Sequence, residues 1–173
     1  MKKESRLSPT SYIVLALIDA AGEATPYELK QAAALTLGNF WSVPHAQIYA
    51  EPERLAREGL LKERREESGR RRRHYKLTAR GRKALQEWLA RPTAAMADLR
   101  DPGMLKLFFG GDPLPLAAVQ LSLHRTKLAE LEALEGRIKD HVPAGAMLAL
   151  RAGIGHEREW VRFWESVGRG ETP

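Results

Sequence analysis

Four consecutive arginines, Arg70–Arg73, are the residues of this sequence whose type and spacing point most directly to a chemistry. Each guanidinium stays positively charged at neutral pH and donates hydrogen bonds in a planar geometry that suits phosphate. Their mutual repulsion would be relieved by a polyanion such as a nucleic-acid backbone. The nearby glutamates Glu63, Glu66 and Glu67 offer an alternative, because they could neutralise the arginines within the protein. We prefer phosphate binding.

A β-hairpin is the element that would carry these arginines. Two short segments of strand-like character flank Ser68 and Gly69, a pair typical of tight turns. The alternation of the second segment predicts that Tyr75 and Leu77 face the protein body, while His74 faces the other way. The arginines then lie near the tip of the hairpin.

The helix expected just before the hairpin, over about residues 44–58, offers a second surface for nucleic acid. Ile48 and Leu55 share one face, which predicts its buried side. The opposite arc carries Ala46, Ala50, Glu53 and Arg57, flanked by Gln47 and Arg54. Small side chains let a helix approach base edges closely, and glutamine or arginine can hydrogen-bond to bases. An ordinary solvated face is the alternative, and Pro52 predicts either a bend or a later helix start.

Further helices surround this pair of elements. Ser8-Pro9 and Thr25-Pro26 each combine a capping residue with a proline suited to the first helical turn. The connector after the second helix ends in Phe40 and Trp41, which we expect to pack inward. A fourth helix follows the hairpin, with an apolar stripe formed by Leu85, Trp88 and Leu89. Three helices, a hairpin and a further helix describe a winged helix-turn-helix.

The C-terminal half is predicted to be helical and too thin to form a core alone. Helices are expected over about 102–109, 113–140 and 144–167. We expect their apolar faces to bury against a second copy of the chain, with packing onto the first or fourth helix as the competing interpretation. The predicted dimer-interface residues are Met147, Leu150, Ile154, Trp160, Val161, Phe163 and Trp164.

Composition narrows the function classes further. Residues 1–100 hold 19 Lys+Arg against 12 Asp+Glu, whereas residues 101–173 hold 9 against 10, so the positive charge is segregated. The chain has no cysteine, which excludes disulfides and thiol chemistry. Its five histidines are scattered, with no catalytic or metal-binding spacing. We therefore expect no enzyme, no metal and no cofactor, and a cytoplasmic protein without a membrane span.

Several motifs together resemble the PadR family of transcriptional regulators. They are LSPTSYIVLALI at 7–18, TPYELKQ at 25–31, FWSVPHAQIYAEPERLAREGLL at 40–61, GRRRRHYKLTARGRKALQEWL at 69–89 and, more loosely, RDPGMLKLFFGG at 100–111. The resemblance implies a homodimeric DNA-binding repressor with an N-terminal winged helix and a helical C-terminal dimerisation domain. By motif match, His45, Gln47 and Tyr49 occupy the recognition helix and Arg70–Arg73 the wing. The sequence departs from the family pattern around this helix, with Pro44 before the histidine and Ala50 after the tyrosine.

These observations predict a mainly α fold with a small β-hairpin, in which a winged helix-turn-helix spans 1–92 and a helical dimerisation domain spans 93–173. The expected function is sequence-specific regulation of transcription, with a protein-interaction module or a non-specific architectural DNA-binding protein as alternatives. Residues expected to contact double-stranded DNA are His45, Ala46, Gln47, Tyr49, Ala50, Arg54, Arg57, Arg70, Arg71, Arg72, Arg73 and His74. The family also allows a pocket for a small hydrophobic or aromatic effector, lined by Trp88, Phe108, Phe109 or Trp160.

Overall fold

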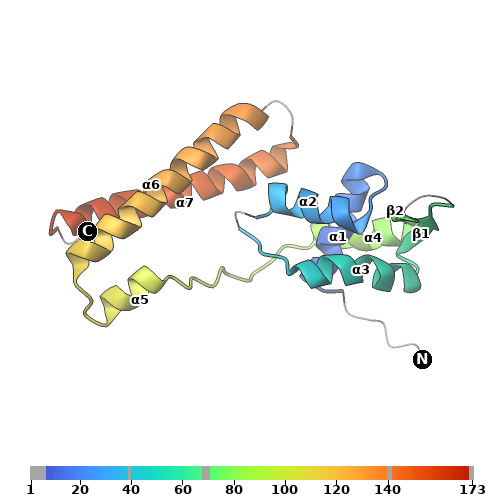
Figure 1. The fold of residues 1–173 in the computed structure, drawn as a ribbon, viewed down its shortest axis with the longest axis horizontal. Coiled ribbons are helices and arrows are strands. Elements are labelled where there is room, and N and C mark those ends of the chain that lie inside the picture. The colour runs from blue at the N-terminus through green and yellow to red at the C-terminus, as the bar shows by residue number, and fades with distance from the viewer. Residues whose placement is uncertain (1–6, 39, 68–70, 140–141, 172–173) are drawn as a thin grey trace. The chain divides into compact units, whose positions relative to one another are not determined.

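The computed structural model of the chain describes residues 7–38, 40–67, 71–139 and 142–171. The chain divides into two compact units, Met1–Ala95 and Met96–Pro173. The first contains, in order, α1 (Pro9–Ala21), α2 (Pro26–Thr36), α3 (His45–Arg57), β1 (Leu61–Arg65), β2 (Arg73–Leu77) and α4 (Ala79–Ala90). The second contains α5 (Pro102–Phe108), α6 (Pro113–Ile138) and α7 (Ala144–Gly168) (Figure 1). The predicted fold class, mainly α with one small hairpin, is confirmed.

Reciprocal side-chain caps fix the starts of the first two helices. The Ser11 backbone N–H donates to Ser8 Oγ at 3.2 Å, and the Ser8 N–H donates to Ser11 Oγ at 2.8 Å. Thr25 and Glu28 repeat this arrangement at the start of α2. Each cap satisfies N–H groups that the helix itself leaves without partners, so both predicted starts are confirmed.

The core of the first unit lies between the helices and the hairpin. Its fully buried side chains include Val14, Leu15, Ile18, Leu29, Ile48, Leu55 and Tyr75. The two strands pair antiparallel, with Leu61 opposite Leu77 and Glu63 opposite Tyr75. Tyr75 and Leu77 are buried, as the alternation predicted. The hairpin is therefore anchored on the helices along its inner face.

Pro52 does not interrupt α3. The helix runs continuously through it, and Pro52 lies with Ile48 and Leu55 on the buried face. A proline inside a helix has no N–H to donate to the carbonyl four residues earlier. The helix lacks this one hydrogen bond, while the Pro52 ring is buried against the core. The helix ends where predicted, just before Gly59, whose backbone is left-handed with φ 75°.

The aromatic residues depart from expectation in the first unit. Phe40 and Trp41 are 62% and 45% exposed, so the prediction that they pack inward is wrong. In the expected stripe of α4 only Leu85 is buried, while Leu89 is exposed. Trp88 stacks on Tyr12 of α1, with ring centroids 4.6 Å apart and planes 8° from parallel. One face of this indole therefore has a partner although the residue stays half exposed.

The second unit is built on an antiparallel pair of long helices, α6 and α7, which lie side by side (Figure 1). Trp164, Ala117 and Val167 form a buried cluster, and Met104, Leu107 and other half-buried side chains surround it. Met147 and Ile154 are also buried within the single chain. Three residues predicted for a dimer interface, Met147, Ile154 and Trp164, are thus already buried in the single chain, and their role in a dimer stays a prediction.

The other residues predicted for the dimer interface remain partly exposed to solvent. Leu150, Trp160, Val161 and Phe163 are half-buried. Within the second unit, the buried cluster that contains Trp164 has its neighbours on α5, α6 and α7. The spacing of apolar residues in α7 predicted its buried face correctly, but it could not predict which helix covers that face.

Close backbone approach requires glycine at position 81, in the first turn of α4. A Cβ atom there would lie 2.1 Å from the Leu60 carbonyl oxygen. We expect Gly81→Ala to lower the free energy of unfolding by about 3 kcal/mol or more, since one backbone segment would have to move. The control is Gly136→Ala in α6, where nothing lies within 4 Å; it should raise stability by about 0.5–1 kcal/mol. Urea titrations that find equal stability for the two variants would contradict this account of Gly81.

Candidate nucleic-acid interface

The outward arc of α3 is exposed, as the helical spacing predicted. Its exposed residues are His45, Ala46, Gln47, Tyr49, Ala50, Glu53 and Arg57. Two of them are alanines one turn apart, so the centre of the arc carries only methyl groups and no bulky side chain. A helix with such a surface can approach the floor of a groove closely.

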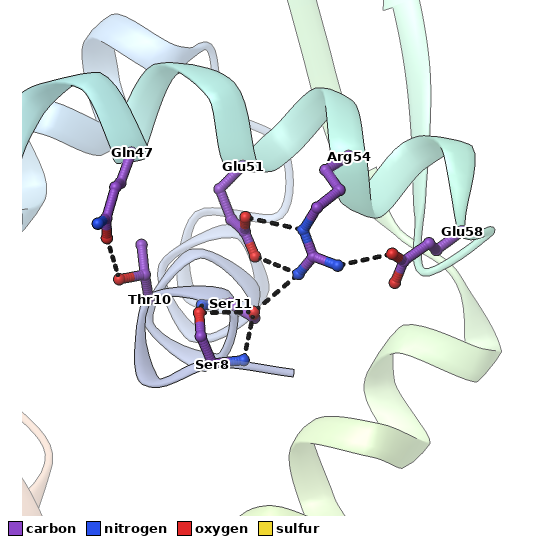
Figure 2. Close-up of polar contacts among 7 residues, drawn as sticks. All are labelled: Ser8, Thr10, Ser11, Gln47, Glu51, Arg54 and Glu58. Carbon is purple, nitrogen blue, oxygen red and sulfur yellow. Dashed lines mark hydrogen bonds and ion pairs between the residues drawn. The ribbon is translucent and has the colours of Figure 1, made fainter. Parts of the chain in front are cut away.

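One edge of α3 instead faces α1. Figure 2 shows Gln47, Glu51, Arg54 and Glu58 in a row along this edge, with the first turn of α1 beside them. Arg54 donates to Glu51 at 3.0 Å, to Glu58 at 2.6 Å and to the Ser11 hydroxyl at 3.0 Å. These charge-assisted bonds hold the guanidinium in one place.

Arg54 therefore ties α3 to α1 in this structure, and its contact with DNA stays a prediction. Its side chain is only 29% exposed, and its neighbour Glu51 is 13% exposed. Using Arg54 to bind a base would break its hydrogen bonds to Glu51, Glu58 and Ser11 and leave Glu51 half-buried without its cation. The spacing of Glu51, Arg54 and Glu58, three and four residues apart, was a signal in the sequence for this network.

The network makes stability depend on pH. Burial raises the pKa of Glu51, but hydrogen bonds from Arg54 and Ser11 outweigh it, so its pKa lies below the ordinary value of 4.5. A lowered pKa in the folded state means that the stabilisation is fully present above 4.5 and is lost as the pH falls through the folded value. The pKa of Glu28 and that of Glu63 are also lowered, by hydrogen bonds from Thr25 and Arg65 respectively.

We expect Glu51→Gln to lower the free energy of unfolding by about 2 kcal/mol at neutral pH, since Arg54 loses a charged partner. On acidification to about pH 3 the variant should lose less additional stability than the parent chain, because Glu28 and Glu63 still titrate but position 51 does not. Urea titrations at both pH values check this. Parallel pH profiles would show that the Glu51 carboxylate does not contribute.

The hairpin carries exposed and paired cations side by side. Arg71 and Arg72 are exposed, and within the described residues neither side chain forms an ion pair. Arg73 lies 3.0 Å from Glu53 of α3 and 3.8 Å from Glu63. Neutralisation inside the protein, the alternative considered from sequence, thus occurs at Arg73, while Arg71 and Arg72 remain available. Arg70 and the Ser68-Gly69 turn lie outside the described residues.

His74 is also engaged by a glutamate. Its Nε2 lies 3.0 Å from Glu66 Oε1, and its side chain is 20% exposed. Hydrogen bonds from His74 and from the Arg72 backbone lower the pKa of Glu66. His74 therefore belongs to the structure of the wing more than to its free surface.

A groove separates the wing from the start of α2. It has a volume of about 690 Å³ and is lined by Thr25, Pro26, Tyr27, Glu28, Tyr49, Arg72 and Arg73. Tyr27 and Tyr49 are 59% and 46% exposed, so their rings form part of an accessible surface. Sequence reasoning placed Tyr49 and the arginines here but missed Tyr27, which lies just inside the capping box of α2.

The residues proposed for an effector pocket fall in different units. Trp88 belongs to the first unit, where it stacks on Tyr12. Phe108 and Phe109 are 82% and 77% exposed on the second unit, and Trp160 lies between His124 and Phe163. Neither unit by itself gathers them into one site. In the part of the chain that the structure describes, no three metal-ligating side chains cluster together and no helix is long and apolar enough to cross a membrane.

Two models of known protein families match this chain. The model of the transcriptional regulator PadR-like family matches residues 14–87, the part that contains α3 and the wing. The model of the virulence activator alpha C-terminal domain matches residues 99–168. The chain belongs to the PadR-like family. Membership of a family of transcriptional regulators confirms the resemblance seen in the sequence, and with it the prediction that the chain is not an enzyme.

Individual members of the PadR-like family are similar to nearly the whole chain in sequence and in structure. The negative transcriptional regulator PadR of Bacillus subtilis (strain 168) is 29% identical over 171 residues, which cover 90% of this chain and 93% of the relative. A crystal structure of Bacillus subtilis PadR in complex with operator DNA has a TM-score of 0.82 at 27% identity, covering 96% of this chain and 99% of that one. A structure of the same relative with p-coumaric acid has a TM-score of 0.74 at 25% identity, covering 94% and 96%.

Proposed function

We propose that the chain is a homodimeric, sequence-specific repressor that acts in the cytoplasm, with α3 in the major groove of DNA and the wing on the adjacent backbone or minor groove. The observation that carries the proposal is the exposed arc of α3 beside two arginines, Arg71 and Arg72, whose side chains are exposed. A low, alanine-centred helix face supplies access to base edges, and the arginines supply sequence-independent affinity for phosphate.

The groove beside the wing supports a particular path for one DNA strand. Arg72 and Arg73 line one part of it and Tyr27 and Tyr49 another, so cations and phenol hydroxyls surround the same space. Phosphate oxygens accept hydrogen bonds from both kinds of group. A backbone segment entering this groove would bring the neighbouring bases toward the arc of α3.

A second copy of the chain is proposed because the second unit exposes large apolar side chains. On α5 these are Leu105, Phe108 and Phe109, and on α6 they are Leu114, Val119 and Leu123, each more than half exposed. Exposed apolar surface of this extent marks an interaction site. Two winged helices on one symmetric dimer would read two half-sites, which raises affinity through effective concentration.

A small aromatic effector is proposed by analogy alone. Bacillus subtilis PadR has been crystallised with p-coumaric acid. The exposed aromatic rings of the second unit, Phe108 and Phe109, are the groups of this chain that could contribute to such a contact. Release of a bound duplex on addition of p-coumaric acid would support the proposal, and an unchanged complex at saturating acid would refute it for this compound.

Selection from a random duplex library tests the main proposal. The full chain should enrich one sequence containing two related half-sites, and it should bind that sequence at least about 1,000-fold tighter than random DNA at moderate salt. Binding without enrichment would point to an architectural protein. No binding at low salt would point to a module that recognises another protein.

A further inference from the structure

Two neighbouring residues of α1 contact α3 at points two turns apart. The Thr10 hydroxyl donates to Gln47 Oε1 at 2.9 Å, and the Ser11 hydroxyl accepts from Arg54 at 3.0 Å (Figure 2). Thr10 is 9% exposed and Ser11 is fully buried. Both contacts come from the first turn of α1, which the Ser8 cap holds in place.

The second contact fixes how α3 sits on α1. Glu51 and Glu58 of α3 hold the Arg54 guanidinium in place, and this guanidinium donates to Ser11 of α1, so rotation of α3 about its axis would break that bond. With α3 fixed, the remaining freedom of the Gln47 side chain is that of its own torsions. The Thr10 hydroxyl removes much of this freedom by binding one end of the amide.

The orientation of the amide decides what Gln47 can read. Gln47 is exposed at the border between the α1-facing edge and the outward arc. Its Oε1 is occupied by Thr10, whereas its Nε2 has no partner within the residues that the structure describes. A glutamine held in this way presents an N–H donor. In the major groove guanine, adenine and thymine offer acceptors, whereas cytosine offers an amino donor.

We propose that Thr10 is a positioning residue that holds the Gln47 amide at a base edge, so that Gln47 discriminates between bases at the contacted base pair. This inference rests on the proposed function. A hydroxyl both donates and accepts, so Thr10 can hold one end of the amide while the other end faces the base; without the hydroxyl the amide is held in no orientation. Thr10 itself does not touch DNA.

The test uses the full chain, the duplex that it selects from a random library, and the set of single-base variants of that duplex. Thr10→Val removes the hydroxyl at nearly constant shape, Thr10→Ala does so without a β-branch, and Thr10→Ser retains the hydroxyl. Gln47→Ala and the double variant T10V/Q47A complete a double-mutant cycle. Fluorescence anisotropy gives each affinity, and urea unfolding reports whether each variant is folded.

We expect Gln47→Ala to lose discrimination at one base pair of each half-site. Thr10→Val and Thr10→Ala should lose discrimination at that same pair by about fivefold, with affinity for unrelated duplexes unchanged. Thr10→Ser should keep the parental preference, and T10V/Q47A should match Gln47→Ala.

Two results would overturn the inference alone. One is a parental preference retained by folded Thr10→Val or Thr10→Ala. The other is an equal loss on every duplex, as expected if Thr10 only stabilises the fold. A parent chain that selects no sequence at all would overturn the proposed function and this inference together.

Discussion

Replacing Arg71 and Arg72 together by alanine is expected to lower affinity for every DNA duplex by about 10- to 100-fold at low salt. Both side chains are exposed, and within the described residues neither forms an ion pair with a glutamate. Each phosphate contact that is lost removes about one released counterion, so the slope of log affinity against log salt should become about 2 units less steep. Sequence preference should change little, because phosphate contacts do not read bases.

The matched control is Arg158→Ala with Arg162→Ala on α7, an equal change of net charge on exposed arginines of the other unit. It should leave the salt slope nearly unchanged. Equal losses in the two double variants would mean that only the total charge of the protein matters, and an unchanged affinity in R71A/R72A would remove the wing from the interface.

Glu53→Gln should act in the opposite direction. Glu53 lies on the exposed arc of α3 and binds Arg73 at 3.0 Å. Neutralising it frees Arg73 for phosphate and removes a negative charge from the surface proposed to face DNA. Because exposed ion pairs are weak, the expected gain in affinity is about two- to fivefold.

The second large effect is expected at the apolar surface of the second unit. Phe108→Asp should raise the dissociation constant of the dimer by about 100- to 1,000-fold, because burial of a phenyl ring contributes about 2 kcal/mol and a symmetric interface contains the ring twice. Phe108 is 82% exposed in the single chain, where its ring makes an edge-on contact with Phe109 at a centroid distance of 5.2 Å, so the substitution disturbs little buried packing. Sedimentation velocity over a range of protein concentrations measures the effect.

Loss of the dimer should also reduce binding to DNA. Affinity for a duplex with two half-sites should fall by about 100-fold or more, whereas affinity for one half-site should stay the same. The control, Ala97→Asp, introduces the same charge at an exposed position between α4 and α5. A Phe108→Asp protein that still sediments as a dimer, or a parent chain that is monomeric throughout, would rule out this interface.

Local chemistry explains why much of the first unit could be predicted. Ser8, Thr25 and Thr78 cap their helices within a few residues of themselves, so their effect does not depend on the rest of the fold. The alternation of the second strand predicted the burial of Tyr75 and Leu77 correctly, since a strand has two faces and one must cover the core. The strand alternation and the Thr78 cap together predicted a hairpin between α3 and α4.

Contacts between distant residues account for what the sequence did not reveal. Arg54 and Gln47 stand on the same edge of α3, and only the position of α1 shows that both are bonded to hydroxyls there. Arg73 belongs to the arginine run, yet it forms an ion pair with Glu53, which lies on α3. Four apolar residues stay exposed among the described residues: Phe40, Trp41, Phe108 and Phe109.

By itself, the sequence determined the order of the elements, the cationic character of the wing and the resemblance to the PadR-like family, because each depends on neighbours in the chain or on residue types alone. Only the tertiary structure decided which cations are free, which face of α3 is tied to α1 and which apolar residues are left for a partner. The physical reason is that hydrogen bonds, ion pairs and burial depend on distance in space, and residues 10 and 47, or 53 and 73, become neighbours only when the chain has folded.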